Sequence, residues 1–334
     1  MRTYLLKRIL LMIPTLLGIT IITFAIVRLA PGDPATMRIG SAASGGLVDQ
    51  QMAKAIIEKT RIEFGLDKPI HVQYGLWVWK IARLDFGRSY KDNRPVMEKI
   101  TERLPVTLQI NIIALFLTYL LAIPLGIFSA THQHTTADKI TTTALFILYS
   151  LPSFWVATML ILFVGGGDYF HWFPISGISS LDAEKLAFVP WLKDRIWHLV
   201  LPVFCLTYAS LAYVSRQMRA GMLETIRQDY IRTARAKGLS EKAVILRHAF
   251  RNSLIPIITL LGFLLPAMLG GSVIIESIFT IPGMGLLGFE AILSRDYPVV
   301  MAISTISAFL TLLGLLLADV AYALVNPTIS LEAQ

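Results

Sequence analysis

Side chains that could perform covalent or metal chemistry are sparse in this sequence. The chain has a single cysteine, Cys205, so it forms neither an internal disulfide nor a cysteine metal cluster. His132 and His134 stand two residues apart without a third ligand at metal-binding spacing, which favours a solvated loop over a zinc site. No Gly-Lys dipeptide occurs, which excludes a P-loop and ATP hydrolysis by that route. The chemistry that remains is binding, not catalysis.

A long group of charged side chains lies between residues 216 and 251, where basic residues far outnumber acidic ones. Apolar residues recur three and four positions apart in its first half, which predicts an amphipathic helix. Gly238 interrupts that helix, and Ser240 followed by Glu241 is typical of a new helix start. We therefore expect a helix, a tight turn and a short helix at the membrane surface. Small residues at the turn would let another backbone approach closely: Ala234, Ala236 and Gly238.

That pattern has a simpler interpretation, a basic helix that binds anionic lipid. The two hypotheses differ in what a large side chain would do at the turn. If another protein docks there, a bulky residue at Ala234 or an aspartate at Gly238 is expected to block docking and leave the membrane fold intact.

The rest of the chain is apolar enough to be embedded in a membrane. Hydrophobic residues make up 55% of it and charged residues only 16%, against about a quarter in soluble domains. Six runs of residues without Asp, Glu, Lys or Arg are each long enough for a helix to cross about 30 Å of hydrocarbon. In none of these runs do apolar and polar residues alternate with a period of two, as they would in barrel strands. The sequence predicts an all-α integral membrane protein with six transmembrane helices, in the runs Ile9–Val27, Leu104–Ala137 (ending near Ala130), Ile140–Gly167, Ile196–Ser215, Asn252–Ile275 and Tyr297–Ala318.

The bias of basic residues toward short cytoplasmic loops gives an orientation. It places loop 216–251 in the cytoplasm, and six crossings then place both termini there. The first run is too long for a signal peptide and is read as a retained helix, residues 1–30. Residues 31–103 are expected to form an exoplasmic domain with helices at Asp49–Phe64 and Ile70–Leu84, and residues 104–325 a five-helix core.

The segment Asp229–Pro256 resembles the EAA loop of inner-membrane permeases of binding-protein-dependent ABC importers, in their dipeptide, oligopeptide and nickel branch. Further short motifs similar to those of that branch occur over nearly the whole chain: Arg28-Leu-Ala-Pro-Gly-Asp-Pro, Gly65-Leu-Asp-Lys-Pro, Asp85-Phe-Gly, Arg103-Leu-Pro, Pro152-Ser-Phe-Trp, Ile281-Pro-Gly-Met-Gly and Arg295-Asp-Tyr-Pro. Two departures are Arg232, where the broad pattern has a glutamate, and Asn326-Pro327, where the branch commonly has Asp-Pro.

The resemblance implies a type I importer permease in the bacterial inner membrane. Its partners would be a second homologous permease chain, two ABC ATPase subunits, an extracytoplasmic substrate-binding protein and membrane lipid, with no nucleic acid. ATP and magnesium would be bound by the ATPases, and this chain would need no cofactor. Peptide is the first choice of substrate and a nickel complex the second. A secondary carrier, which works without an ATPase, is the alternative from another class of transporter. An ion-coupled carrier would usually place ionisable residues near the membrane midplane, and the uncharged runs contain no such central pair.

The resemblance also implies roles for particular residues. Coupling to the ATPase would involve Ala234, Ala236, Gly238, Leu239, Ser240, Glu241, Lys242, Leu246 and His248. An exoplasmic gate would involve Glu276, Pro282, Gly283 and Gly285. Asp319 lies at a span end and receives no role. Polar residues within the runs could line a transport path, although small hydroxyls often bond to their own helix: Gln109, Asn111, Thr118, Ser150, Thr207, Ser210, Ser272, Ser304 and Ser307.

Overall fold

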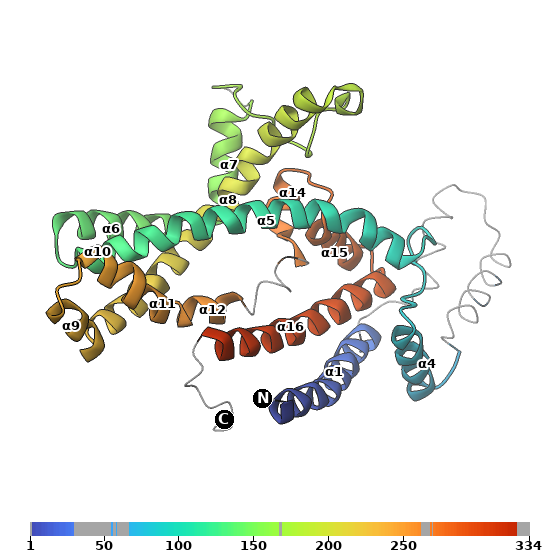
Figure 1. Ribbon diagram of the computed structural model, residues 1–334. Coiled ribbons are helices and arrows are strands. Elements are labelled where there is room, and N and C mark those ends of the chain that lie inside the picture. The colour runs from blue at the N-terminus through green and yellow to red at the C-terminus, as the bar shows by residue number, and fades with distance from the viewer. Residues whose placement is uncertain are drawn as a thin grey trace. The chain divides into compact units, whose positions relative to one another are not determined.

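The described part of this computed structural model is built from helices and contains no β-strand (Figure 1). The structure describes residues 2–29, 67–166, 169–261 and 270–325, with single residues 55, 58 and 268. The helices are α1 (Arg2–Leu29), α4 (Ile70–Ala82), α5 (Val96–Thr131), α6 (Thr136–Ser150), α7 (Ser153–Val164), η1 (Ala183–Lys185), α8 (Phe188–Ile226), α9 (Asp229–Ala236), α10 (Glu241–Ala243), η2 (Val244–Ala249), α11 (Phe250–Ser253), α12 (Ile255–Leu261), α14 (Val273–Ile278), α15 (Met284–Leu293) and α16 (Tyr297–Val325).

Four of these helices, α1, α5, α8 and α16, are long and apolar enough to cross a membrane. They coincide with four of the six predicted runs, and the all-α membrane fold is confirmed. The fifth predicted run, Asn252–Ile275, lies partly outside the described residues, as does the expected helix Asp49–Phe64. The expected helix at Ile70–Leu84 is present as α4. Because α5 begins at Val96, the expected domain boundary at residue 103 falls inside a helix.

The run Ile140–Gly167 is not one helix as expected, because α6 and α7 meet at an angle of 91°. Pro152 causes the break: it has no N–H to continue α6, and it forces Leu151 into an extended conformation. The Tyr208 hydroxyl donates a hydrogen bond of 3.1 Å to the Leu151 carbonyl. This bond gives the Leu151 carbonyl a donor, which the break in the helix would otherwise leave it without.

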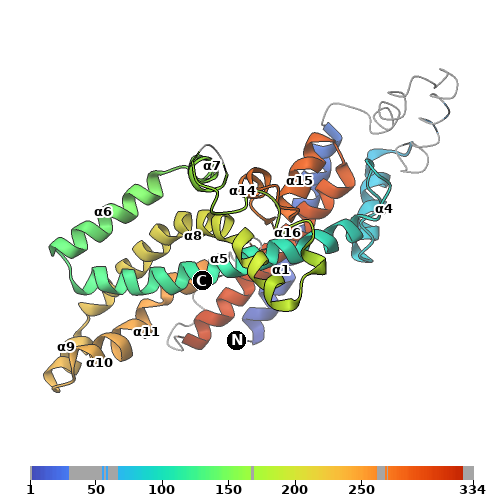
Figure 2. The same ribbon diagram turned by 90° about the horizontal axis from the view of Figure 1, so that it is seen from above.

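The described residues pack as two compact units. The first comprises the described residues within 1–5, 105–286 and 311–334, and in it α8 packs against α6, α7, α11 and α12. In Figure 2, α8 runs between α6 on one side and α11 on the other, and it packs against both. Glycines permit two close approaches: a Cβ at Gly126 would lie 2.6 Å from Met218 Cβ, and one at Gly221 would lie 2.7 Å from the Ser253 carbonyl oxygen.

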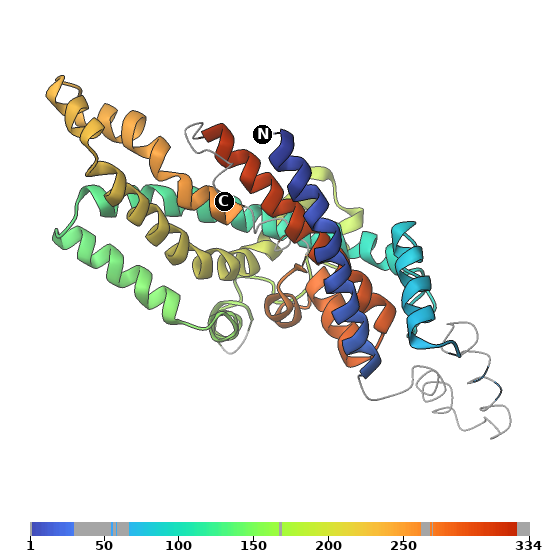
Figure 3. The ribbon, with the colours of Figure 1, turned by 90° about the horizontal axis from the view of Figure 1, so that it is seen from below.

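The second unit comprises the described residues within 6–104 and 287–310. Within it α1 runs beside α16 (Figure 3), and Phe24 and Val27 of α1 pack with Met301 of α16. The Tyr74 hydroxyl of α4 lies 3.0 Å from Thr20 Oγ1 of α1. Asp296, 1% exposed, accepts hydrogen bonds from the hydroxyl of Ser89 and the amide of Tyr90. A polar anchor thereby fixes the segment before α5.

Candidate functional site: the basic loop and the Glu276 turn

The basic loop, residues 216–251, folds as the helix, turn and helix that its sequence predicts. Helix α9 ends at Ala236, and Gly238 follows with φ of +75°, a conformation that suits glycine. The Gly238 amide donates to the Arg235 carbonyl (2.9 Å) and the Leu239 amide to the Ala234 carbonyl (3.4 Å). This is the Schellman pattern, which satisfies the last carbonyls of a helix and reverses the chain.

The second helical stretch of the basic loop starts at the predicted cap. The Ser240 hydroxyl accepts a hydrogen bond of 3.4 Å from the Ala243 amide at the start of α10. Residues Val244–Ala249 then form a π-helix before α11 continues the same direction. Such wide turns are rare and occur frequently at functional sites.

An ion pair joins the two arms across the turn. Arg235 Nε and Nη2 donate to the two carboxylate oxygens of Glu241 at 3.0 and 2.6 Å. Hydrogen bonds from this guanidinium lower the pKa of Glu241, and the carboxylate in turn raises the pKa of Arg235. Both side chains are well exposed, so the pair orients the arms more than it stabilises them.

The inner face of the basic loop is part of the core of the first unit. Ile231, Val244 and Ala249 are fully buried there, and Ala234 is 6% exposed. These residues pack with Met218 and Met222 of α8. The Ala234 side chain therefore faces this chain's own core. This burial contradicts the expectation that a bulky residue there would leave the fold intact, because a larger side chain would have to displace its core neighbours.

The outer face carries most of the other residues expected to couple. Ala236, Gly238, Leu239, Ser240, Glu241, Lys242 and Leu246 are exposed, whereas His248 is half-buried. Leu239 and Leu246 are 43% and 50% exposed, and Tyr230 of α9 is 42% exposed. The outer face therefore combines exposed leucines, a tyrosine and cations.

The Glu276 turn, residues 272–286, brings the four residues of the expected gate together. Glu276 is 4% exposed. One carboxylate oxygen accepts from the Thr107 hydroxyl (3.1 Å) and the Ser272 amide (3.3 Å), and the other from the Leu286 amide (2.8 Å). Thr107 also accepts from the Met284 amide at 2.7 Å. The carboxylate thus accepts the hydrogen bonds that backbone amides of this buried turn would otherwise donate to water.

Two glycines make room for this carboxylate. A Cβ at Gly283 would lie 2.5 Å from the Glu276 carboxyl carbon, and one at Gly285 would lie 2.7 Å from the Val273 amide nitrogen. Pro282 precedes them and is half-buried. The turn is therefore a closely packed unit with no room for side chains at these positions.

Sequence reasoning missed one buried acid, Asp138 at the start of α6. It is 4% exposed, and its oxygens accept from the Ser129 hydroxyl, from the His134 amide (3.1 Å) and from Arg219 Nη2 (2.8 Å). A signal was present, because Thr135 and Asp138 have the spacing of a capping box, and the Thr135 hydroxyl does accept from the Asp138 amide. Asp138 joins the turn between α5 and α6 to α8.

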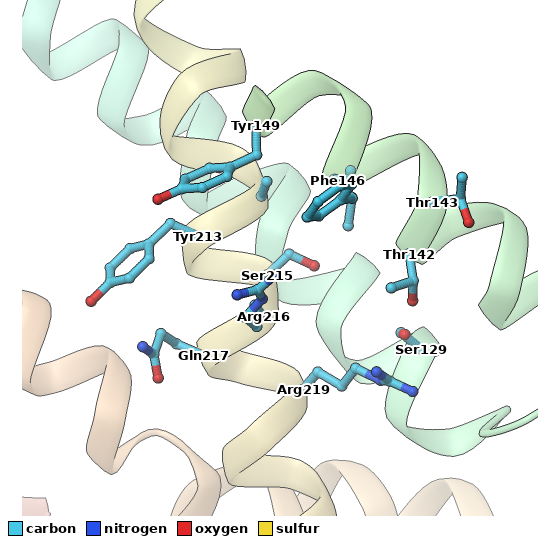
Figure 4. Close-up of a pocket in the computed structure, with 12 residues that line it drawn as sticks. Ser129, Thr142, Thr143, Phe146, Tyr149, Tyr213, Ser215, Arg216, Gln217 and Arg219 are labelled. Carbon is cyan, nitrogen blue, oxygen red and sulfur yellow. The ribbon is translucent and has the colours of Figure 1, made fainter. Parts of the chain in front are cut away.

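Beside this cluster lies a cavity of about 390 Å³ between α6 and α8 (Figure 4). Its lining includes Phe146, Tyr149, Tyr213, Arg216 and Arg219. Asn111, Thr118 and Ser210, three of the polar residues considered for a transport path, line a second cavity of about 450 Å³ in the same unit. No group of three or more potential metal ligands occurs in the described part of the chain.

Comparison with known proteins identifies the family. A model of the binding-protein-dependent transport system inner membrane component matches residues 122–331, and a model of the N-terminal part of such membrane components matches residues 1–111. The chain belongs to this family. It is therefore a permease subunit, an α-helical multi-pass protein of the inner membrane and not an enzyme. Membership also implies a substrate-binding protein and an ATPase as partners.

Relatives match this permease subunit over nearly its full length. It is 41% identical to the oligopeptide transport system permease protein AppB of Bacillus subtilis (strain 168), over 98% of this chain and 99% of AppB. It is 35% identical to the dipeptide transport system permease protein DppB of Escherichia coli (strain K12), over 98% and 99%. A crystal structure of an amino acid ABC transporter with histidines matches with a TM-score of 0.45 and 15% identity, over 67% of this chain and 93% of that one.

Proposed function

We propose that this chain is one of two homologous permease subunits of an ATP-driven peptide importer. In this proposal the basic loop is cytoplasmic and binds an ATPase subunit, and the Glu276 turn lies at the exoplasmic end. The observation that carries the proposal is the basic loop itself. It is fixed to α8 by a buried inner face, and it presents exposed apolar and basic side chains on its outer face.

The mechanism follows from that attachment. Two ATPase subunits bind ATP and magnesium, and their closure moves the outer face of the basic loop. Because Ile231 and Val244 are buried against α8, the loop and α8 would move as one body. The two permeases then change from inward-facing to outward-facing, and a binding protein delivers substrate from outside. Peptide is favoured over a nickel complex because the similar permeases carry names of oligopeptide and dipeptide systems.

Apolar-to-acidic changes on the outer face test the proposed coupling. We expect Leu246→Asp to reduce the ATPase that co-purifies with tagged permease at least tenfold, because a charge would be desolvated in the interface. Leu181→Asp is the matched control, since Leu181 is fully exposed in another loop. Undiminished co-purification and peptide uptake in Leu246→Asp would exclude the basic loop as the coupling element.

The lipid hypothesis predicts a different result. If the basic loop only binds anionic lipid, Lys237→Gln and Arg247→Gln would weaken attachment to lipid by about 1 kcal/mol per charge and leave ATPase assembly unchanged. Proteoliposomes with and without phosphatidylglycerol separate the two outcomes.

The proposed orientation has its own test. In a Cys205→Ser background, we expect Asn93→Cys to react with an impermeant maleimide added to intact spheroplasts, since Asn93 is exposed. Labelling that occurs only after lysis would reverse the topology.

A further inference from the structure

The 390 Å³ cavity between α6 and α8, here called the α6–α8 cavity, has an apolar end and a basic end. Phe146 and Tyr149 of α6 and Tyr213 of α8 line the apolar end, where they are 58%, 56% and 45% exposed. Figure 4 shows the two tyrosines apart from Arg219, which extends toward Ser129 at the end of α5. A ligand that fills this cavity therefore has to be apolar at one end and polar at the other.

The basic end keeps one positive charge that no described residue compensates. Arg219 donates to the Asp138 carboxylate at 2.8 Å, and the Ser129 and Thr142 hydroxyls donate to the same carboxylate, so these groups already have partners. Arg216 is exposed and makes no ion pair within the described part of the chain. Two arginines and one aspartate thus leave a net charge of +1. A free guanidinium suits phosphate oxygens, because it can form two parallel hydrogen bonds with them.

The position of Arg216 along α8 is the position of a lipid headgroup. The uncharged run Ile196–Ser215 ends directly before it, and those 20 residues extend over about 30 Å, the thickness of the hydrocarbon. On α6, the uncharged run starts directly after Lys139. Tyr149 lies six residues beyond Thr143, about 9 Å further along that helix toward the hydrocarbon. Both helices therefore place the basic end of the cavity at the membrane surface and the apolar end among acyl chains.

We propose that the α6–α8 cavity binds one anionic phospholipid, with its phosphate diester at Arg216 and an acyl chain along Phe146, Tyr149 and Tyr213. The single negative charge of phosphatidylglycerol matches the single uncompensated guanidinium, whereas the ammonium group of phosphatidylethanolamine would lie beside two arginines. An anion without a chain would leave the aromatic end uncovered. In the orientation proposed above the site lies in the cytoplasmic leaflet, where the lipid would contact α8 just before it enters the basic loop.

Cysteine protection tests whether the cavity holds a lipid. In a Cys205→Ser background, Thr143→Cys places a thiol in the cavity, and Ala144→Cys is the matched control, because Ala144 is exposed on the same helix but does not line it. The permease, purified with its partner subunits and delipidated, receives phosphatidylglycerol, phosphatidylethanolamine or inorganic phosphate. With phosphatidylglycerol at about twice its Kd, mass action should slow maleimide labelling of Thr143→Cys about threefold. Labelling of Ala144→Cys should not change, and the other two additions should have no effect.

Charge removal tests the role of Arg216 in the same assay. Arg216→Gln is expected to raise the Kd for phosphatidylglycerol about fivefold, and Arg216→Lys, which keeps the charge, about twofold or less. Lys139→Gln is the matched control, since Lys139 is exposed at the end of the uncharged run of α6 but does not line the cavity. We expect this variant to leave the Kd unchanged. Native mass spectrometry should show fewer copies with a retained phosphatidylglycerol in Arg216→Gln than in Lys139→Gln.

Four results would overturn the lipid site. Protection by inorganic phosphate alone would indicate a site for a chain-free anion, and equal protection by phosphatidylethanolamine would remove the role of charge. Equal effects of Arg216→Gln and Lys139→Gln would indicate diffuse attraction to the membrane surface. A Thr143→Cys thiol that stays unreactive in the delipidated complex would mean that a partner subunit covers the cavity. None of these measurements requires peptide uptake, so a failure of the proposed function and a failure of the lipid site are distinguishable.

Discussion

The basic loop and the Glu276 turn solve the same local problem, a sharp reversal of a helical chain, by different means. The loop reverses at Gly238 with backbone hydrogen bonds between neighbours and an exposed Arg235–Glu241 pair. The turn is held by a buried carboxylate that bonds to Thr107, distant in sequence, and to backbone amides on both sides. The first leaves its outer face available to a partner, whereas the second directs its polar groups inward.

This difference implies that the two regions tolerate change differently. Groups on the outer face of the basic loop can be altered at little cost in stability, because water replaces what is lost. Groups in the Glu276 turn cannot, since a buried amide that loses its acceptor finds no other. Changes in the loop should therefore affect binding to a partner, and changes in the turn should affect folding.

The largest contrast is expected between two glutamates. Glu276→Ala leaves the Leu286 amide and the Thr107 hydroxyl without their acceptor, and should lower stability by about 3 kcal/mol. Glu241→Ala removes an exposed pair and should cost less than about 1 kcal/mol. The measurement is the thermal unfolding midpoint of purified permease in detergent. Equal shifts for the two variants would contradict the comparison.

Two glycines give the next contrast. Gly283→Ala places a methyl group 2.5 Å from the Glu276 carboxyl carbon, and the resulting displacement should cost about 2 kcal/mol. Gly238→Ala meets no atom within 4 Å, so only its positive φ is penalised, by about 1 kcal/mol. The same thermal measurement applies. A larger loss for Gly238→Ala would show that the loop, rather than the turn, is the more tightly packed reversal.

These contrasts mark what the sequence could reveal. The Gly238 reversal and the Ser240 cap follow from local chemistry, and both were predicted from residues a few positions apart. The sequence does not predict that the Ala234 side chain faces the core, because the small size of a residue does not show which side of its helix will be covered by the rest of the chain. Charge-free runs predict six helices, and four of them coincide with long helices of the described residues, but hydropathy does not register the 91° break that Pro152 imposes.

The Glu276 turn shows the other limit of sequence reasoning. Its four residues were proposed together from resemblance, yet Thr107 was missed because it lies in a different helix, 169 positions away from Glu276. Asp138 and Arg219 meet over a separation of 81 positions. Contacts of this kind depend on how helices pack, and no local pattern in one sequence specifies them.

A smaller effect is expected at the cap of the second arm. Ser240→Ala removes the acceptor for the Ala243 amide and should destabilise the start of α10 by about 0.5–1 kcal/mol, whereas Ser240→Asp keeps an acceptor and should not. Hydrogen exchange of the residue 241–243 amides measures this, with an acceleration of about two- to fivefold in Ser240→Ala. Exchange that is equal in both variants would mean that the tertiary contacts of Val244 alone hold this arm.

The smallest effect is the pH dependence of the Arg235–Glu241 pair. Since the pKa of Glu241 is lowered in the folded chain, the pair contributes stability that is present above the unfolded pKa of glutamate. That contribution is lost as pH falls through the lower, folded pKa. Its size is about 0.5 kcal/mol or less, because both groups are exposed and screened by water.

A double-mutant cycle isolates this coupling energy. It compares the unaltered chain with Arg235→Gln, Glu241→Gln and the double variant, each unfolded thermally at pH 7 and at a series of lower pH values. We expect a coupling energy of about 0.5 kcal/mol or less at pH 7 that declines as the Glu241 carboxylate becomes protonated. A coupling that does not change with pH would mean that the two side chains interact through packing of their stems, and that the arms of the basic loop are joined independently of charge.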